Sequence, residues 1–406
     1  MRGQGKIYSA WMLLSAMLLL NPTLSLKAAD KTPTLSQKTY RTLQSIEEML
    51  DAGQSDQALR RLEELIKETA KRPYAQAIAL QSLAHTHIDL GDYKRAIPYL
   101  KRSLELQALP DDVQQRSRYN LAQLYMATEK FSAAVELLNH WFANTSEPTA
   151  EAYVMLGSAY LQLQQYKKAI TPLRQAIKLS NQPNENWYQS LLGAYHELKN
   201  YKQCVKLLHS MLKLFPDRAS YWRQLSGMEL MRKNNKQALA VMELAYLHGH
   251  LSTERDLLNL AQLYSLLNAP YKAAQLRENE IQKGRIKATV KSWEQTANAW
   301  YQAKEMDNSI TAFEKAVARG GGVELRLRLA QLYLETRRWS DAQDRLREIL
   351  KEKDSKWRDR SWLLLGIACY EGKAMEQARS AFSEALKFKK TQKEAEQWLA
   401  FLNKQA

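Results

Sequence analysis

Small residues recur along this chain at a nearly constant interval, and this recurrence restricts the fold more than any other feature of the sequence. A second small residue often stands twelve positions before the recurring one, as Ala84 does before Ala96 and Gly157 before Ala169. This spacing is typical of two helices that are joined by a tight turn and packed at small side chains. The recurring positions, between 33 and 38 residues apart, are 58, 96, 134, 169, 204, 238, 273, 309, 342 and 378.

The composition agrees with an all-helical chain. Among 406 residues there are 14 Gly and 10 Pro, too few for the many turns of a β-sandwich or barrel. Apolar residues make up 45% of the chain, which is enough for a core and excludes a disordered protein. Because each helix pair buries its apolar stripe only against its neighbours, the pairs are expected to stack into one continuous array.

Longer motifs repeat with the same period. The six residues Asn120 to Tyr125 recur identically at Asn259 to Tyr264, and all but the first recur once more, ending at Tyr333. The unit that begins at Ala150 shows the fullest pattern. Its pattern residues are Tyr153, Leu156, Gly157, Tyr160, Ala169 and Ala176. These residues resemble the tetratricopeptide repeat, a helix-turn-helix unit of about 34 residues.

The resemblance implies an all-α fold, a right-handed superhelical solenoid of about ten helix-turn-helix repeats. We expect the solenoid to cover residues 39–388, with a degenerate first repeat around Tyr40 to Ala70 and with Ser309 in place of the usual alanine. Residues 389–406 are predicted to form a capping helix, since polar residues separate Ala395, Trp398, Leu399 and Leu402 at helical spacing.

The N-terminus predicts export. Arg2 and Lys6 precede an uncharged, mostly apolar run from Ile7 to Leu20, and small residues follow at Ala28 and Ala29. This order is typical of a secretory signal peptide, predicted over residues 1–29, with a short linker over 30–38. The run is shorter than the roughly 20 residues that span a bilayer, which favours a cleaved signal peptide. A signal that is retained as an anchor is the alternative. The expected location is the periplasm of a Gram-negative bacterium, with no integral membrane segment after cleavage.

The net charge of +16 is unevenly distributed. Residues 30–200 contribute +1 and residues 201–406 contribute +12. Such a surface suits nucleic acid, an anionic envelope surface or an acidic protein. We predict no nucleic acid, because an exported chain seldom meets it and acidic residues interrupt the basic face. These acidic residues are Glu294, Glu324, Glu335 and Glu371.

No pattern in the sequence predicts an enzyme, a cofactor or a metal centre. Cys204 and Cys369 lie five repeats apart in apolar surroundings and are expected to be buried thiols. His248 and His250 flank a glycine in a predicted turn, so a metal at this pair stays open, with a solvated loop as the preferred interpretation. The oligomeric state also stays open.

The family resemblance implies a partner-binding groove lined by the first helix of each pair. Amides recur at the sixth and ninth positions of these helices, and an amide offers both a donor and an acceptor to a peptide backbone. Aromatic and cationic residues lie nearby in the sequence. The groove residues predicted in this way are Tyr119, Asn120, Gln123, Arg223, Gln224, Arg255, Asn259, Gln262, Lys291, Asn298, Tyr301, Arg328 and Gln331.

A narrower resemblance concerns Met242 to Ala274. This stretch looks like the periplasmic tetratricopeptide proteins associated with TonB, ExbB and ExbD in gammaproteobacteria. The resemblance implies a non-catalytic scaffold that assists TonB-dependent energy transduction and the uptake of iron, haem or siderophores, with TonB, ExbB or ExbD components or an acidic envelope protein as partners. A general envelope-assembly or cell-wall-associated adaptor is the alternative. In either case, charge reversals after residue 200 are expected to weaken partner binding more than equal changes before it.

Overall fold

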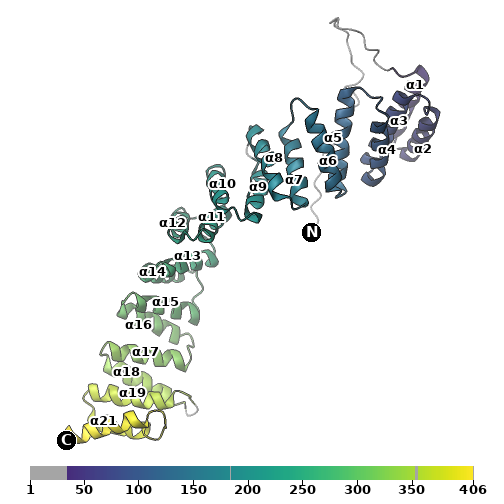
Figure 1. Cartoon of the computed structure of the whole chain (residues 1–406). Helices are drawn as coiled ribbons and strands as arrows, with labels where there is room; N and C mark the ends of the chain where they lie inside the picture. Colours follow the sequence, from purple (N-terminus) through teal and green to yellow (C-terminus); the bar gives the residue numbers. More distant parts are fainter. Residues whose placement is uncertain (1–33, 183, 353–354, 406) are drawn as a thin grey trace. The chain divides into compact units, whose positions relative to one another are not determined.

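The computed structural model describes residues 34–182, 184–352 and 355–405, and in these residues it contains twenty-one α-helices and no strand (Figure 1). The predicted signal peptide and residues 30–33 of the predicted linker lie outside the described residues. Consecutive helices pair, and the chain divides into two compact units, Met1–Leu179 and Ser180–Ala406. The predicted solenoid over residues 39–388 therefore consists of two stacks of helix pairs, one in each unit.

The N-terminal unit contains four helix pairs. The region predicted as a degenerate first repeat forms the pair α1 and α2, so its departures from the pattern do not prevent pairing. The helices of this unit are α1 (Gln37–Asp51), α2 (Ser55–Glu68), α3 (Pro73–Asp89), α4 (Tyr93–Glu105), α5 (Asp111–Ala127), α6 (Phe131–Ala143), α7 (Ala150–Gln162) and α8 (Tyr166–Leu179).

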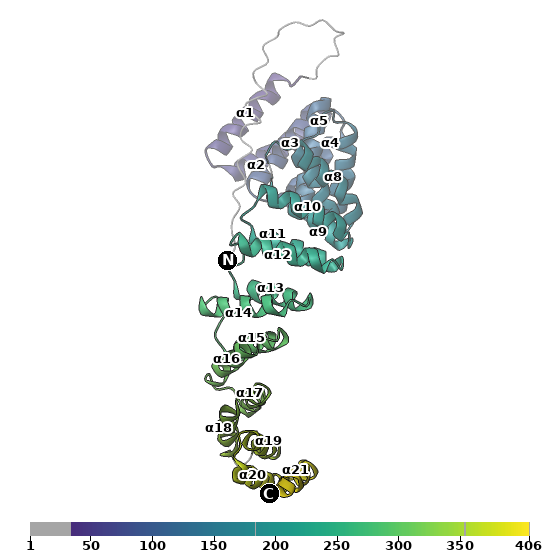
Figure 2. The ribbon, with the colours of Figure 1, turned by 90° about the vertical axis from the view of Figure 1, so that its left-hand side faces the viewer.

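The C-terminal unit contains six helix pairs and a last helix, stacked one after another (Figure 2). Its helices are α9 (Glu185–Glu197), α10 (Tyr201–Leu214), α11 (Ala219–Met231), α12 (Asn235–Leu247), α13 (Glu254–Leu266), α14 (Pro270–Gln282), α15 (Val290–Gln302), α16 (Met306–Val317), α17 (Val323–Glu335), α18 (Trp339–Leu350), α19 (Arg358–Glu371), α20 (Met375–Ala385) and α21 (Gln392–Gln405). The helix-turn-helix architecture predicted from the sequence is confirmed.

All ten recurring small residues lie on the second helix of a pair, and all have a relative exposure of 0%. Two of them depart from alanine and are still accommodated. The Ser309 hydroxyl donates a hydrogen bond to the Ala297 carbonyl at 2.9 Å, and the Cys204 thiol lies 4.0 Å from the Leu192 carbonyl. Both Cys204 and Cys369 are free and buried, as predicted, and burial raises the pKa of each thiol.

Every turn inside a helix pair uses the same backbone conformation. The residue five positions before each recurring small residue has a positive φ. The N–H of the residue after it donates a hydrogen bond to the carbonyl five residues earlier in the chain, as Arg338 does to Tyr333 at 2.8 Å. This arrangement is a Schellman motif, which usually has glycine at the left-handed position. The residues found there are Gly53, Gly91, Glu129, Gln164, Lys199, Lys233, Asn268, Lys304, Arg337 and Lys373.

Lys304→Gly is expected to raise the free energy of unfolding by about 0.5–1 kcal/mol, because glycine removes the steric cost of a side chain at φ 62°. Urea unfolding of the full chain measures the change. The matched control is Lys206→Gly, which places glycine inside α10 and is expected to lower stability by about 1 kcal/mol. Equal effects of the two substitutions would contradict the assigned turn.

Partly buried hydrogen bonds join successive repeats of the C-terminal unit. On α13, α15 and α17, the aromatic residue at the eleventh position donates to a glutamate on the second helix of the preceding repeat. Tyr264 donates to Glu243 at 2.8 Å, and Trp300 donates to Glu278 at 2.9 Å. Burial, with the glutamate beside it, raises the pKa of Tyr264. These bonds connect neighbouring repeats in addition to their apolar contacts.

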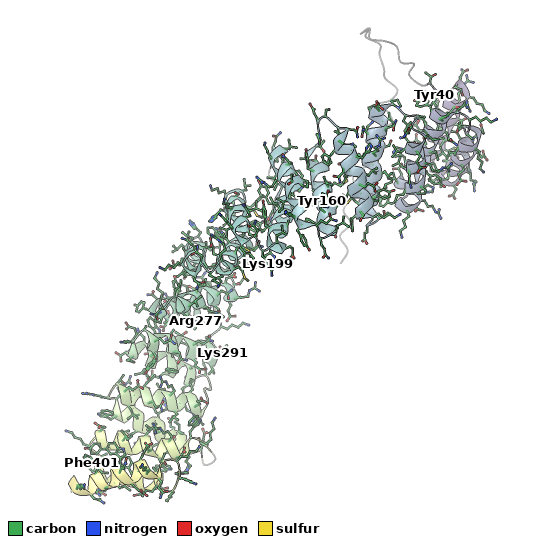
Figure 3. The ribbon with its side chains drawn as sticks, viewed as in Figure 1. Tyr40, Tyr160, Lys199, Arg277, Lys291 and Phe401 are labelled. Carbon is green, nitrogen blue, oxygen red and sulfur yellow. The ribbon has the colours of Figure 1, made fainter. Side chains whose placement is uncertain are left out.

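The last helix covers the end of the C-terminal stack. Ala395 and Leu402 of α21 are buried, and Trp398 stacks on Phe382 with ring centroids 5.3 Å apart. Phe401, labelled in Figure 3, is 42% exposed at this end. Within the described part of the chain, no helix combines the length and apolar character needed to cross a membrane.

Candidate functional site

The predicted groove residues fall in both units. Tyr119, Asn120 and Gln123 belong to α5 of the N-terminal unit, where only Gln123 is exposed. The other ten belong to the first helices of four successive pairs in the C-terminal unit: α11, α13, α15 and α17. The two groups therefore belong to different units, and the larger one is in the basic half of the chain.

On α13 and α15 the polar residues follow the same helical spacing. Arg255, Asn259 and Gln262 occupy positions i, i+4 and i+7 of one helix face, and all three are exposed. Lys291 and Asn298 hold the corresponding places on α15 and are also exposed. Residues at this spacing are neighbours on one side of a helix. The exposed polar residues of this side are called the A face: Gln224, Arg255, Asn259, Gln262, Lys291, Gln295 and Asn298.

Two glycines open the surface of the neighbouring first helices. Gly193 of α9 and Gly227 of α11 stand at the same repeat position as Gln262 and Asn298, and a Cβ built on either meets no described atom within 4 Å beyond the backbone of its own helix. Packing therefore does not require glycine at either position, although glycine inside a helix costs about 0.5–1 kcal/mol relative to alanine. Both leave the helix backbone open to close approach by another chain.

Glycines one repeat position earlier, at the eighth position, are required by packing. A Cβ on Gly157 would lie 2.7 Å from Leu173, and one on Gly366 would lie 2.4 Å from the Phe382 ring. These two glycines allow the helices of their own pair to pack closely. The contrast separates glycines that the fold needs from glycines that leave the surface open.

Arg223, predicted as a cationic groove residue, is tied to the next repeat. Its guanidinium lies 2.9 Å from Asp256, whose side chain is 1% exposed and also accepts from the Thr253 hydroxyl at 2.7 Å. This ion pair neutralises the Arg223 charge and links α11 to the start of α13. Arg223 therefore positions repeats, while Arg255 and Lys291 have no ion pair within 4 Å among the described residues.

The remaining predicted residues are partly buried in contacts between helices. The Arg328 guanidinium lies 4.7 Å from the centre of the Tyr301 ring, so these two residues join α15 and α17. Tyr119 packs on Trp141 with ring centroids 5.0 Å apart. Asn120 and Gln331 are also partly buried. These residues border exposed surface but offer less of it than Asn259 or Lys291.

One polar contact at the A face was not predicted. Arg277, on the second helix α14, donates a hydrogen bond to the Gln295 side chain of α15 at 3.0 Å, and Figure 3 labels it near Lys291. Burial lowers the pKa of Arg277. Prediction of the groove from first helices alone could not find this residue, because no repeat position on a second helix signalled it.

His248 and His250 pack around one indole. Their rings lie 6.5 Å and 5.7 Å from Trp222, in stacked orientations, and 6.2 Å from each other. No cluster of three or more His, Cys, Asp or Glu residues with the geometry of a metal site occurs in the described residues. The chemistry that the A face offers is hydrogen bonding and positive charge.

Two repeat models match the sequence. One, described as the tetratricopeptide repeat protein 21 C-terminal ARM domain, matches residues 22–223, and one described as tetratricopeptide repeat matches residues 327–393. No curated protein matches the chain. Solenoids of this type are generally protein-interaction scaffolds and are typically non-catalytic.

Among solved structures, the chain is similar to YrrB, a tetratricopeptide-repeat protein with an unusual peptide-binding site, at 17% identity and a TM-score of 0.36, with 45% of this chain and 90% of that chain covered. A tetratricopeptide repeat protein from Parabacteroides merdae has 15% identity and a TM-score of 0.38, and the match covers 74% of this chain and 100% of that chain. A chain of the Naa15/Naa10 structure bound to HypK-THB has 14% identity and a TM-score of 0.49, and the match covers 91% of this chain and 61% of that chain. The two matching models and the ten observed helix pairs support a tetratricopeptide-type repeat in this chain.

Proposed function

We propose that this protein is a non-catalytic scaffold that binds an extended polypeptide along the A face of its C-terminal unit. The observation that carries the proposal is the regular exposure of amides and cations on α11, α13 and α15, beside two helix glycines that packing does not require. Exposed amides supply the donors and acceptors that an extended backbone needs. The open glycines permit that backbone to come close.

The charge of the A face selects the kind of segment. Arg255 and Lys291 are exposed and stand at the same repeat position on successive first helices. Exposed cations that carry no ion pair attract carboxylates and suppress binding of basic segments. An acidic segment that places carboxylates one repeat apart is therefore the favoured partner.

We also propose where the scaffold acts. The order of basic, apolar and small residues at the N-terminus supports export to the periplasm of a Gram-negative bacterium. The resemblance of Met242 to Ala274 supports a role beside TonB, ExbB and ExbD in energy transduction for iron, haem or siderophore uptake. A segment of one of these proteins would then be the acidic partner of the A face.

Affinity capture from envelope fractions tests the proposal. The full chain is expected to retain TonB or ExbD, and Asn259→Ala with Gln262→Ala is expected to lower the amount retained about tenfold, because each amide then loses one hydrogen bond worth about 0.7 kcal/mol. The matched control is Gln275→Ala with Asn279→Ala, which removes two exposed amides from the second helix α14 of the same repeat. This control is expected to retain the partner fully.

Other outcomes separate the alternatives. Recovery of only cell-wall enzymes or outer-membrane assembly proteins would contradict the TonB role and favour the general adaptor. Equal losses in the two double variants would contradict the A face as the binding surface. Catalytic turnover that disappears with the Asn259 and Gln262 substitutions would contradict a purely binding function.

A further inference from the structure

The turns inside the first three helix pairs of the C-terminal unit carry a concentrated set of exposed apolar side chains. Five of the exposed large apolar residues described in the structure lie in or beside these three turns: Leu198, Leu230, Met231, Leu266 and Tyr271. The most exposed of them are Met231 at 61% and Leu266 at 58%. Single exposed apolar residues are ordinary, but a group in consecutive turns marks an interaction surface.

Lysines accompany these apolar residues in the first two of the three turns. Lys199 and Lys202 flank the first turn, and Lys233 and Lys236 flank the second; all four are exposed and none has an ion pair within 4 Å among the described residues. Figure 3 labels Lys199 at the margin of the ribbon. We define the turn patch as these nine residues: Leu198, Lys199, Lys202, Leu230, Met231, Lys233, Lys236, Leu266 and Tyr271.

Fold requirements do not explain the lysines. Lys199 and Lys233 occupy left-handed positions, with φ of 54° and 60°, where glycine is the less strained residue. A cation at a helix C-terminus is favourable, yet the corresponding turns of the N-terminal unit use Gly53, Gly91, Glu129 and Gln164. Neither the turn geometry nor the helix dipole therefore demands lysine here.

The three turns belong to one edge of the unit. They connect α9 to α10, α11 to α12 and α13 to α14, and these helices pack consecutively. Packed helices lie about 8–10 Å apart, so one surface can touch three neighbouring turns. In the first two turns, exposed apolar and basic side chains stand together, which is the combination that membrane-surface segments use.

We propose that the turn patch binds the surface of a bilayer that contains anionic phospholipids. The lysines would meet the phosphate groups, and Met231, Leu266 and their apolar neighbours would enter the boundary between headgroups and acyl chains. Such a surface accepts separate protruding side chains without a preformed pocket. The A face remains a different surface, formed by residues at the second, sixth and ninth positions of first helices, whereas the turn patch lies at the C-terminal ends of first helices and around the turns that follow.

Vesicle flotation of the full chain tests this surface. The probes are vesicles of phosphatidylcholine alone and vesicles of phosphatidylcholine mixed with phosphatidylglycerol. Each lysine near an anionic surface contributes about fivefold to partitioning, so Lys199→Glu, Lys233→Glu and Lys236→Glu together are expected to lower partitioning to the mixed vesicles about 100-fold. Glutamate suits this turn position, because Glu129 occupies it at φ 60° in the N-terminal unit.

The matched control reverses the same number of charges elsewhere in the unit. Lys389→Glu, Lys390→Glu and Lys393→Glu change exposed lysines near α21 and are expected to lower partitioning less than about threefold. All variants share the N-terminal segment, so its own affinity for vesicles cancels in the comparison. Circular dichroism melting confirms that each variant is folded.

A second variant tests the apolar half of the patch. Met231→Ser with Leu266→Ser keeps the net charge and is expected to lower partitioning to the mixed vesicles about tenfold. Unchanged partitioning in this variant, or equal losses in the two lysine triples, would overturn the proposal. Full vesicle binding by the Lys199, Lys233 and Lys236 triple, together with loss of a captured envelope protein, would overturn it in favour of a protein-docking surface.

Discussion

Gly366→Val is expected to lower the free energy of unfolding by at least about 3 kcal/mol, the upper end of the usual cost of overpacking. Even the Cβ of the new side chain would lie 2.4–2.8 Å from three atoms of the Phe382 ring, which is fully buried. Neither the ring nor the helix backbone can move away without disturbing Trp398, which stacks on Phe382. Urea unfolding of the full chain measures the loss.

Gly193→Val is the matched control. It makes the same change inside another first helix, where a Cβ meets no atom within 4 Å, so stability is expected to change by less than about 0.5 kcal/mol. If Gly193→Val were as destabilising as Gly366→Val, the distinction between packing glycines and open glycines would be wrong. The open glycines would then give no support to the A face.

Arg255→Glu combined with Lys291→Glu is expected to weaken binding of the partner segment about 100-fold. Each reversal replaces attraction by repulsion at an exposed cation that forms no ion pair with a described residue, and about tenfold per reversal is a moderate value for charges at an interface. The purified periplasmic domains of TonB and ExbD are the probes, and isothermal titration with the full chain gives the dissociation constants.

The comparison for these reversals comes from the N-terminal unit. Lys71→Glu with Lys94→Glu makes the same change of net charge at exposed positions before residue 200 and is expected to weaken binding less than about threefold. Equal weakening by both double variants would show that overall charge, and not the A face, attracts the partner. A salt series separates the local effect from the general one.

The helix pairing could be predicted from the sequence because it depends on local and periodic properties. The interval between small residues identifies where two helices approach, and all ten recurring small residues are fully buried there. Ser309, which departs from the pattern, is satisfied by the Ala297 carbonyl within its own pair. Departures of this kind do not disturb the period, so the fold class could be predicted in spite of them.

The candidate site could be predicted only in part. The repeat positions of Asn259, Gln262 and Lys291 indicate an outward-facing side of a first helix, and these residues are exposed. The same reasoning could not show that Arg223 is neutralised by Asp256, 33 residues later, or that Arg277 reaches Gln295 from a second helix. Both contacts depend on how one repeat packs on the next.

The spacing of small and aromatic residues was thus sufficient for the all-helical repeat architecture, since each helix pair follows from residues close together in the chain. Only the packed structure distinguishes Gly193 from Gly366, or the free Arg255 from the paired Arg223. The physical reason is that these differences depend on side chains from neighbouring helices and repeats. Whether such a neighbour occupies the space or neutralises the charge depends on helix separation, which the repeat period leaves undetermined.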